Sequence, residues 1–181
     1  MRVLCVNGES DPAETGSFIE MHKAGVDITV ITWPDTFNYD ALIAAGVPTI
    51  PFVLKGKISR PCIRFMRDEL KRGQYDILHM LDKRGTMNGL FASIGLNVKL
   101  VAYRGIVGNQ SYLDPLSWLY LLNPRLDRII CVCEAIRQDL LKRGVPGIRM
   151  RRDVPVTIHK GHNPDWYQEP FEDLEQFGIP D

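Results

Sequence analysis

Residues 75–105 constrain the fold of this chain more than any other stretch. Short apolar runs lie near its two ends, at residues 77–81 and 98–102. Between them, apolar side chains recur at helical spacing: Met87, Leu90, Phe91 and Ile94. This order predicts a strand, a helix and a second strand. Because such crossovers are right-handed, we expect parallel strands whose carboxyl ends meet at one edge of a sheet, where ligands of open parallel sheets bind.

The same alternation of strand and helix runs through most of the chain. Apolar, β-branched runs predict further strands at residues 3–7, 27–32, 48–53, 128–133 and 154–158. Helices are predicted at residues 15–23, 38–45, 61–72 and 134–142. A length of 181 residues with 45% hydrophobic content suits one domain with a real core. We therefore predict an α/β fold with a parallel sheet flanked by helices.

Composition narrows the classes of partner and cofactor. The 22 basic and 22 acidic residues cancel, so we expect no nucleic-acid partner. The chain opens with a short strand instead of a signal peptide, which indicates a cytosolic protein. Cys131 and Cys133 are predicted to lie on one face of a strand as reduced thiols. His159 and His162 have no third ligand nearby, so we expect no metal site.

Four polar residues lie around the end of the first strand of the 75–105 unit. His79 either points into a ligand site or packs as a hydrogen-bonded structural residue, and the sequence favours neither. Asp82 precedes the helix, and we favour a role as its N-cap over a catalytic role. Lys83 and Arg84 stand at the helix start, where their charges and the helix dipole favour a phosphate or another anion.

An arginine and several glycines indicate further places where a ligand can approach. Arg104 and Gly105 follow the second strand at the same sheet edge, in a loop suited to a polar ligand. Gly16 is predicted at the opening of the first helix, where it either admits a ligand or serves only the turn. Close packing against the sheet, or close approach by a ligand, is predicted at three glycines: Gly85, Gly89 and Gly95.

Residues 112–122 are unusually rich in aromatic residues and leucine for a connection. We favour packing as a short helix over an exposed surface for a lipid-linked substrate, a partner domain or peripheral membrane contact. The run is too short to span a bilayer.

Four segments resemble the N-terminal domain of retaining family 4 glycosyltransferases, which have the GT-B architecture of two Rossmann-like domains. The segments are YDILHM with the glycine-containing helix after it, KLVAYRG, DRIICVCEAIRQDLL and VTIHKGHNPDWY. Members of that family typically show a D-x-I-I-x-V-S-E-A strand before a helix and a later I-x-N-G-x-D bend. Here Cys133 replaces the usual serine, Lys160 replaces the usual asparagine, and Arg104 stands nearest to a frequent histidine.

The resemblance implies the acceptor-side half of an enzyme that transfers a sugar from a nucleotide-sugar donor, with retention, to a glycan or lipid-linked acceptor. It assigns residues 1–165 to this Rossmann-like half and residues 166–181 to a linker toward a C-terminal donor-binding domain that this chain does not contain. It further implies no metal or other cofactor, a place in cell-envelope polysaccharide or lipopolysaccharide biosynthesis, a cytoplasmic site at the inner face of a membrane, and little activity from this half alone.

The resemblance also suggests roles for particular residues. Gly16 would border the donor phosphates or the acceptor, and Lys83 and Arg104 would contact the acceptor. Glu134 would either line the site or cap the helix that it opens. Two alternatives stay open: a non-catalytic binding or interaction domain, and part of a nucleotide-sugar epimerase, which shares the two-domain fold.

Overall fold

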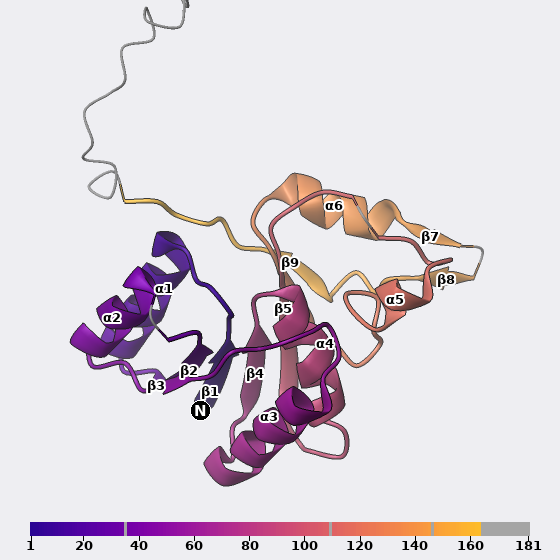
Figure 1. Cartoon of the computed structure of the whole chain (residues 1–181). Coiled ribbons are helices and arrows are strands. Elements are labelled where there is room, and N and C mark those ends of the chain that lie inside the picture. Colours follow the sequence, from indigo (N-terminus) through magenta and orange to yellow (C-terminus); the bar gives the residue numbers. More distant parts are fainter. Residues whose placement is uncertain (35, 109, 146, 164–181) are drawn as a thin grey trace, which may run out of the picture.

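The computed structural model describes residues 1–34, 36–108, 110–145 and 147–163, so the expected linker at residues 166–181 lies outside it. Seven parallel strands form one sheet in the order β3-β2-β1-β4-β5-β6-β9 (Figure 1). Their bounds are β1 (Arg2–Val6), β2 (Asp27–Thr32), β3 (Thr49–Pro51), β4 (Ile77–Met80), β5 (Lys99–Arg104), β6 (Arg128–Cys131) and β9 (Pro155–Thr157). The predicted α/β fold is confirmed.

Helices cover both faces of this sheet. Their bounds are α1 (Pro12–Lys23), α2 (Phe37–Ala44), α3 (Arg60–Gly73), α4 (Lys83–Ala92), α5 (Pro115–Trp118) and α6 (Glu134–Lys142). On one face, α1 and α2 bury a cluster that includes Phe18, Val30 and Leu42. On the other face, α3, α4 and α6 bury a larger cluster around Met66 and Leu78. The chain moves outward from β1 to β3 and then returns to place β4 beside β1, so the strand order reverses there.

The predicted strand, helix and strand at residues 75–105 are confirmed as β4, α4 and β5. The two strands are parallel, with Ile77 opposite Lys99. Close packing explains Gly89, where an added Cβ would lie 2.5 Å from the sulfur of buried Met80. At Gly85, an added Cβ would lie 3.1 Å from a methyl carbon of Val6 on β1, which is a less severe contact. Gly95 differs: its φ of +74° and open surroundings show a turn after the helix, so the packing expected there is wrong.

Helix α1 begins three residues earlier than the sequence pattern predicted. Asp11 is its N-cap: Asp11 Oδ1 accepts a bond from the Glu14 N–H at 2.8 Å, and Glu14 Oε2 accepts one from the Asp11 N–H at 3.3 Å. This capping box satisfies free donors of the first turn and fixes the start at Pro12. Gly16 therefore lies in the second turn and not at the helix opening.

Other boundaries also differ from the sequence pattern. Strand β6 ends at Cys131, and Cys133 is the N-cap of α6, so the expectation that both cysteines lie on one strand face is wrong. A short antiparallel hairpin, β7 (Gly144–Val145) and β8 (Ile148–Arg149), was not predicted. Its strands are too short to show an alternating pattern. Within the described residues, no helix has the length and apolar character needed to cross a membrane.

Candidate functional site at the ends of β4 and β5

The carboxyl ends of β4 and β5 border a cavity of about 340 Å³, which we call the edge cavity. It is lined by Leu81, Lys83, Tyr103, Arg104, Gly105, Ile106, Gln110 and Tyr120. These residues come from the turn between β4 and α4 with the first residue of α4, from the end of β5 with its following loop, and from the segment after α5. The structure thus brings together Lys83, Arg104 and Gly105, as the shared sheet edge predicted.

The two cationic side chains of the edge cavity are held very differently. Arg104 is only 7% exposed, and its guanidinium donates a hydrogen bond to the Gly108 carbonyl, which fixes the loop after β5. Lys83 is exposed, and its ammonium lies 5.6 Å from the centre of the Tyr120 ring. Burial raises the pKa of Tyr120, and nearby Arg104 partly opposes this rise. Arg104 is therefore a buried positive charge in the wall of the cavity, and Lys83 is an exposed positive charge at its rim.

Gln110 adds a polar atom that the sequence pattern did not single out. Its side chain is 6% exposed, and Oε1 has no hydrogen-bond partner among the described residues. Its backbone is fixed, because Arg143 donates to the Gln110 carbonyl at 2.7 Å. A buried acceptor without a partner costs about 1–3 kcal/mol, a cost that a donor on a bound ligand would remove. Only the fold reveals this residue, since a lone glutamine in a loop carries no pattern.

His79 lies apart from the edge cavity, on the face of the sheet that α1 covers. It lines a second, mostly apolar cavity of about 220 Å³ beside α1, which shares Leu81 and Tyr103 with the edge cavity. Its Nδ1 is 3.9 Å from Cys5 Sγ, and Nε2 has no partner among the described residues. Burial lowers the pKa of His79 to about 4, so the ring is neutral at neutral pH. The structure does not bring it together with Lys83 or Arg104.

Asp82 is the N-cap of α4, as predicted. Its Oδ1 accepts a bond from the Gly85 N–H and its Oδ2 one from the Gly8 N–H, both at 2.7 Å. Both carboxylate oxygens are thus used to join the loop after β1 to α4. Arg84 does not line the edge cavity; its guanidinium carbon lies 5.5 Å from the centre of the ring of Trp33, the residue after β2.

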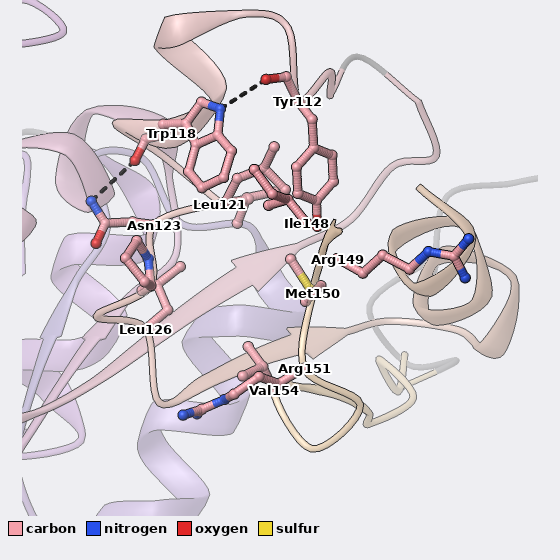
Figure 2. A pocket seen from close by; sticks show the side chains of 12 residues that line it. Tyr112, Trp118, Leu121, Asn123, Leu126, Ile148, Arg149, Met150, Arg151 and Val154 are labelled. Carbon is pink, nitrogen blue, oxygen red and sulfur yellow. Dashed lines mark hydrogen bonds between the residues drawn. The ribbon is translucent and has the colours of Figure 1, made fainter. Parts of the chain in front are cut away.

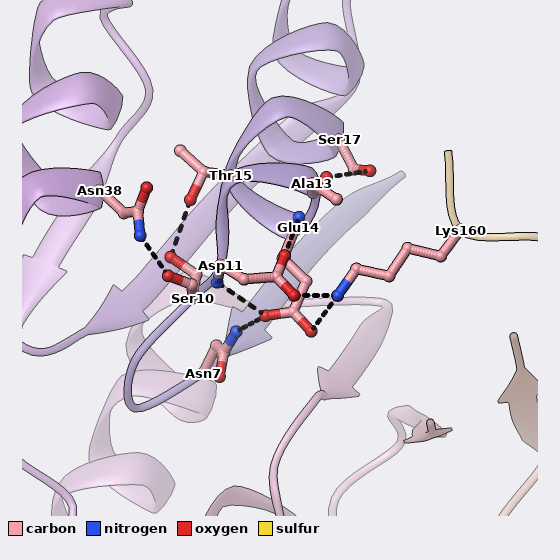
Figure 3. Close-up of polar contacts among 9 residues, drawn as sticks. All are labelled: Asn7, Ser10, Asp11, Ala13, Glu14, Thr15, Ser17, Asn38 and Lys160. Atoms are coloured by element: carbon pink, nitrogen blue, oxygen red, sulfur yellow. Dashed lines mark hydrogen bonds and ion pairs between the residues drawn. The ribbon is translucent and has the colours of Figure 1, made fainter. Parts of the chain in front are cut away.

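The amino end of α1 is closed by a cluster of charged side chains (Figure 3). The Lys160 ammonium contacts Asp11 Oδ2 and lies 3.4 Å from Glu14 Oε1, while Asn7 donates to Glu14 Oε2 at 2.6 Å. Burial alone would raise the pKa of Asp11, but the bonds from Lys160 and from backbone N–H groups lower it overall. Acidic side chains therefore already occupy this helix start, and Lys160 anchors the segment after β9 to it. A binding role for Gly16 stays a prediction.

Glu134 does not line the edge cavity, and it does not cap α6. The N-cap is Cys133, which makes no side-chain capping bond. Glu134 instead accepts bonds from Thr157 at 2.6 Å, from Gln138 at 2.6 Å and from Arg137 at 2.9 Å. These bonds, with that from Thr157 the strongest, lower its pKa to about 2. Glu134 thus joins α6 to β9, and the expected capping role is wrong.

The model of Glycosyltransferase Family 4 matches residues 19–152. The chain belongs to glycosyltransferase family 4. No curated protein matches it significantly.

Solved structures agree with this family 4 assignment at the level of the fold. A glycosyltransferase from Rickettsia africae ESF-5 has a TM-score of 0.66 at 16% identity, over 99% of this chain and 50% of its own. Anabaena Alr3699/HepE in complex with UDP and glucose has a TM-score of 0.65 at 17% identity, over 98% and 49%. The lipopolysaccharide outer core galactosyltransferase WaaB has a TM-score of 0.59 at 12% identity, over 86% and 45%. The chain spans about half the length of each, as expected for the N-terminal domain of a GT-B architecture.

Proposed function

We propose that this family 4 chain is the acceptor-side half of a glycosyltransferase, and that the edge cavity binds the acceptor. The observation that carries the proposal is the meeting of Lys83, Arg104 and unpartnered Gln110 in one cavity at the ends of β4 and β5. A glycan presents many hydroxyl groups, which donate to an amide oxygen and accept from ammonium and guanidinium groups. The family match supports sugar transfer as the chemistry.

The proposed reaction breaks the bond between the anomeric carbon of the donor sugar and its diphosphate oxygen. A new bond forms from that carbon to an acceptor oxygen, whose proton is released, and the configuration at the carbon is retained. The acceptor half must hold the acceptor hydroxyl in place against the donor, which lowers the barrier by orientation. In this chain, Gln110 and Arg104 would fix the acceptor from the cavity wall, while Lys83 would contact it from the rim.

The donor would be a nucleotide sugar held mainly by a second domain, because this chain corresponds to half of its structural neighbours. One neighbour, Alr3699/HepE, was solved with UDP and glucose, which supports a uridine nucleotide sugar as the first donor to test. We propose that cationic side chains and helix termini meet the diphosphate charge without a metal. WaaB acts on lipopolysaccharide by its name, which supports a cell-envelope glycan as the acceptor.

The test uses the product of the whole reading frame that encodes this chain. Sugar transfer is measured at increasing acceptor concentration, with UDP-glucose first and then other nucleotide sugars. Lys83→Gln should raise the KM for the acceptor by about tenfold, as expected for the loss of one charged hydrogen bond, with little change in the KM for the donor. Lys71→Gln, at an exposed position of α3, is the matched control and should change neither value. Equal effects of the two variants would contradict the proposal.

Of the two alternatives that the sequence left open, the family match argues against a nucleotide-sugar epimerase, and the other is a non-catalytic binding domain. It predicts that the same polypeptide binds a glycan without transferring sugar to it from any nucleotide sugar. It also predicts that Lys83→Gln weakens binding of the glycan in a titration that needs no donor. Absence of turnover with every donor, together with saturable glycan binding, would favour this alternative.

A further inference from the structure

The segment that brings Tyr120 to the edge cavity is held in place by contacts within itself (Figure 2). Trp118 Nε1 donates to the Tyr112 carbonyl at 2.9 Å, and the two rings meet edge to face with 5.4 Å between their centroids. Asn123 donates to the Trp118 carbonyl at 3.0 Å. Tyr120 therefore reaches the cavity from a braced segment, so this part of the wall is formed before any ligand binds.

The same segment is also anchored in the core, although not along its whole length. Leu121 and Leu122 are buried, whereas Leu113 and Leu116 are exposed. The preference given above to simple packing of residues 112–122 is thus only half correct. The buried half is the part next to Tyr120, which adds to the rigidity of the cavity wall.

The lining of the edge cavity carries positive charge and no negative charge. Two of its eight residues, Lys83 and Arg104, are cationic, and none is acidic. Within the described ranges of the chain, no carboxylate forms an ion pair with either side chain. Arg104 is only 7% exposed, and a buried guanidinium without a carboxylate partner destabilises the fold. A negative charge on a bound molecule would offset this cost.

Three aspartates lie near the edge cavity, but each is already bonded to other groups. Asp82 accepts bonds from two backbone N–H groups at 2.7 Å, with one carboxylate oxygen for each. Asp114 is the N-cap of α5 and accepts bonds from two N–H groups of that helix, both at 3.1 Å. Asp139 accepts two bonds from Arg143, one to each oxygen and both at 2.8 Å. The positive charge of the cavity is therefore left for a ligand.

Gln110 indicates a second feature of that ligand. Its Oε1 lines the same cavity as a buried acceptor without a partner among the described residues, so it suits a hydroxyl donor and not an anionic oxygen. A sugar with an anionic substituent offers both kinds of group, whereas a neutral glycan offers only hydroxyl groups. The cavity thus combines sites for one anionic group and at least one hydroxyl group.

We propose that the acceptor bound in the edge cavity is a negatively charged sugar, which carries either the carboxylate of a sugar acid or the phosphate of a phosphorylated sugar. Arg104 pairs with the anionic group from the wall, since a planar guanidinium matches the geometry of both anions. Lys83 pairs with it from the rim, and Gln110 accepts a bond from a hydroxyl group. This inference rests on the proposed function, because it names the class of acceptor for the same cavity.

The test is a titration of the isotope-labelled chain with matched methyl glycosides, followed by NMR. Methyl glucuronide and methyl glucoside differ only in a carboxylate in place of a hydroxymethyl group, and the corresponding galactose pair is tested in the same way. The preferred acidic glycoside should bind about 100-fold more tightly than its neutral partner, because each of two charged hydrogen bonds contributes about tenfold.

Lys83→Gln should reduce this ratio to about tenfold, since only the pairing with Arg104 remains. Lys71→Gln, at an exposed position of α3, is the control and should leave the ratio unchanged. The ratio of the two affinities is the decisive readout, because a purely structural defect would weaken binding of both glycosides equally. The 6-phosphate of each methyl glycoside distinguishes the two anions: tighter binding than that of the acidic glycoside assigns a phosphorylated sugar, and weaker binding assigns a sugar acid.

Three results would overturn the inference. Equal binding of the acidic, phosphorylated and neutral glycosides would do so while leaving the edge cavity as the acceptor site. Inorganic phosphate that binds as tightly as the best anionic sugar would show a simple anion site that does not recognise a sugar. Failure of every glycoside to shift the signals of Tyr103, Arg104 and Gln110 would overturn the proposed function as well.

Discussion

The buried, neutral His79 predicts a specific loss of stability on mild acidification. Burial lowers its pKa from 6.5 to about 4 in the folded chain. In the unfolded chain the histidine keeps its ordinary pKa of 6.5, so between pH 6.5 and 4 it binds a proton that the folded chain does not bind. The free energy of unfolding is therefore highest above pH 6.5 and declines as the pH falls toward 4. From these two values, the free energy of unfolding should fall by about 2 kcal/mol between about pH 7 and pH 5 from this residue alone.

The other ionisable groups that line the His79 cavity are Glu14, Tyr103, His159 and Lys160. The assay is urea denaturation followed by tryptophan fluorescence at several pH values through this window, which lies above the usual range for carboxyl titration. His79→Leu should remove most of the decline, because leucine does not titrate and suits an apolar cavity. His22→Gln, on α1, is the control and should retain the decline that His79 causes. A decline of equal size in the His79→Leu protein would refute the reasoning.

Three further predictions concern the cavity, the charged cluster and the packing of α4. Gln110→Leu should leave the free energy of unfolding unchanged or raise it by up to about 1 kcal/mol, because it removes a buried amide oxygen that has no hydrogen-bond partner among the described residues. The same variant should weaken binding of the sugar acceptor in a direct titration. Lys160→Met should lower the free energy of unfolding by about 1 kcal/mol, measured by denaturation, and raise the pKa of Asp11 toward its usual value, measured by NMR titration. An equal loss of stability at high salt would argue against an ionic cause. Gly89→Ala should lower the melting temperature despite its better helix propensity, since overpacking against Met80 costs about 1–3 kcal/mol; an unchanged melting temperature would show that the core adjusts freely.

The parts of the fold that depend on local patterns were predictable from the sequence. Continuous apolar runs identified the main parallel strands, and the prediction of a βαβ unit at residues 75–105 correctly placed the carboxyl ends of β4 and β5 at one edge. Asp82 was predictable as an N-cap because an aspartate just before a helix commonly accepts a hydrogen bond from a free backbone N–H of the first turn. The start of α1 was missed because a capping box with proline at the first turn extends a helix beyond its apolar pattern.

The candidate site was predictable only where the strand ends determined it. Lys83, Arg104 and Gly105 follow β4 and β5 directly, so topology alone placed them together. Gln110 and Tyr120 line the same cavity because of the path that a loop and a short helix take after β5. No periodic pattern of apolar residues predicts that path. Likewise, the contact of Lys160 with Asp11 joins residues at opposite ends of the described chain and depends on where the segment after β9 passes.

The central claim is that this family 4 chain carries the acceptor site and not the main donor site. The most direct measurement is NMR titration of the isotope-labelled chain with UDP-glucose and, separately, with a panel of glycan acceptors. The account predicts saturable shifts from an acceptor at Lys83, Tyr103, Arg104 and Gln110, and no saturable shifts from UDP-glucose. Saturable binding of UDP-glucose at the edge cavity, or acceptor shifts confined to other parts of the chain, would contradict it.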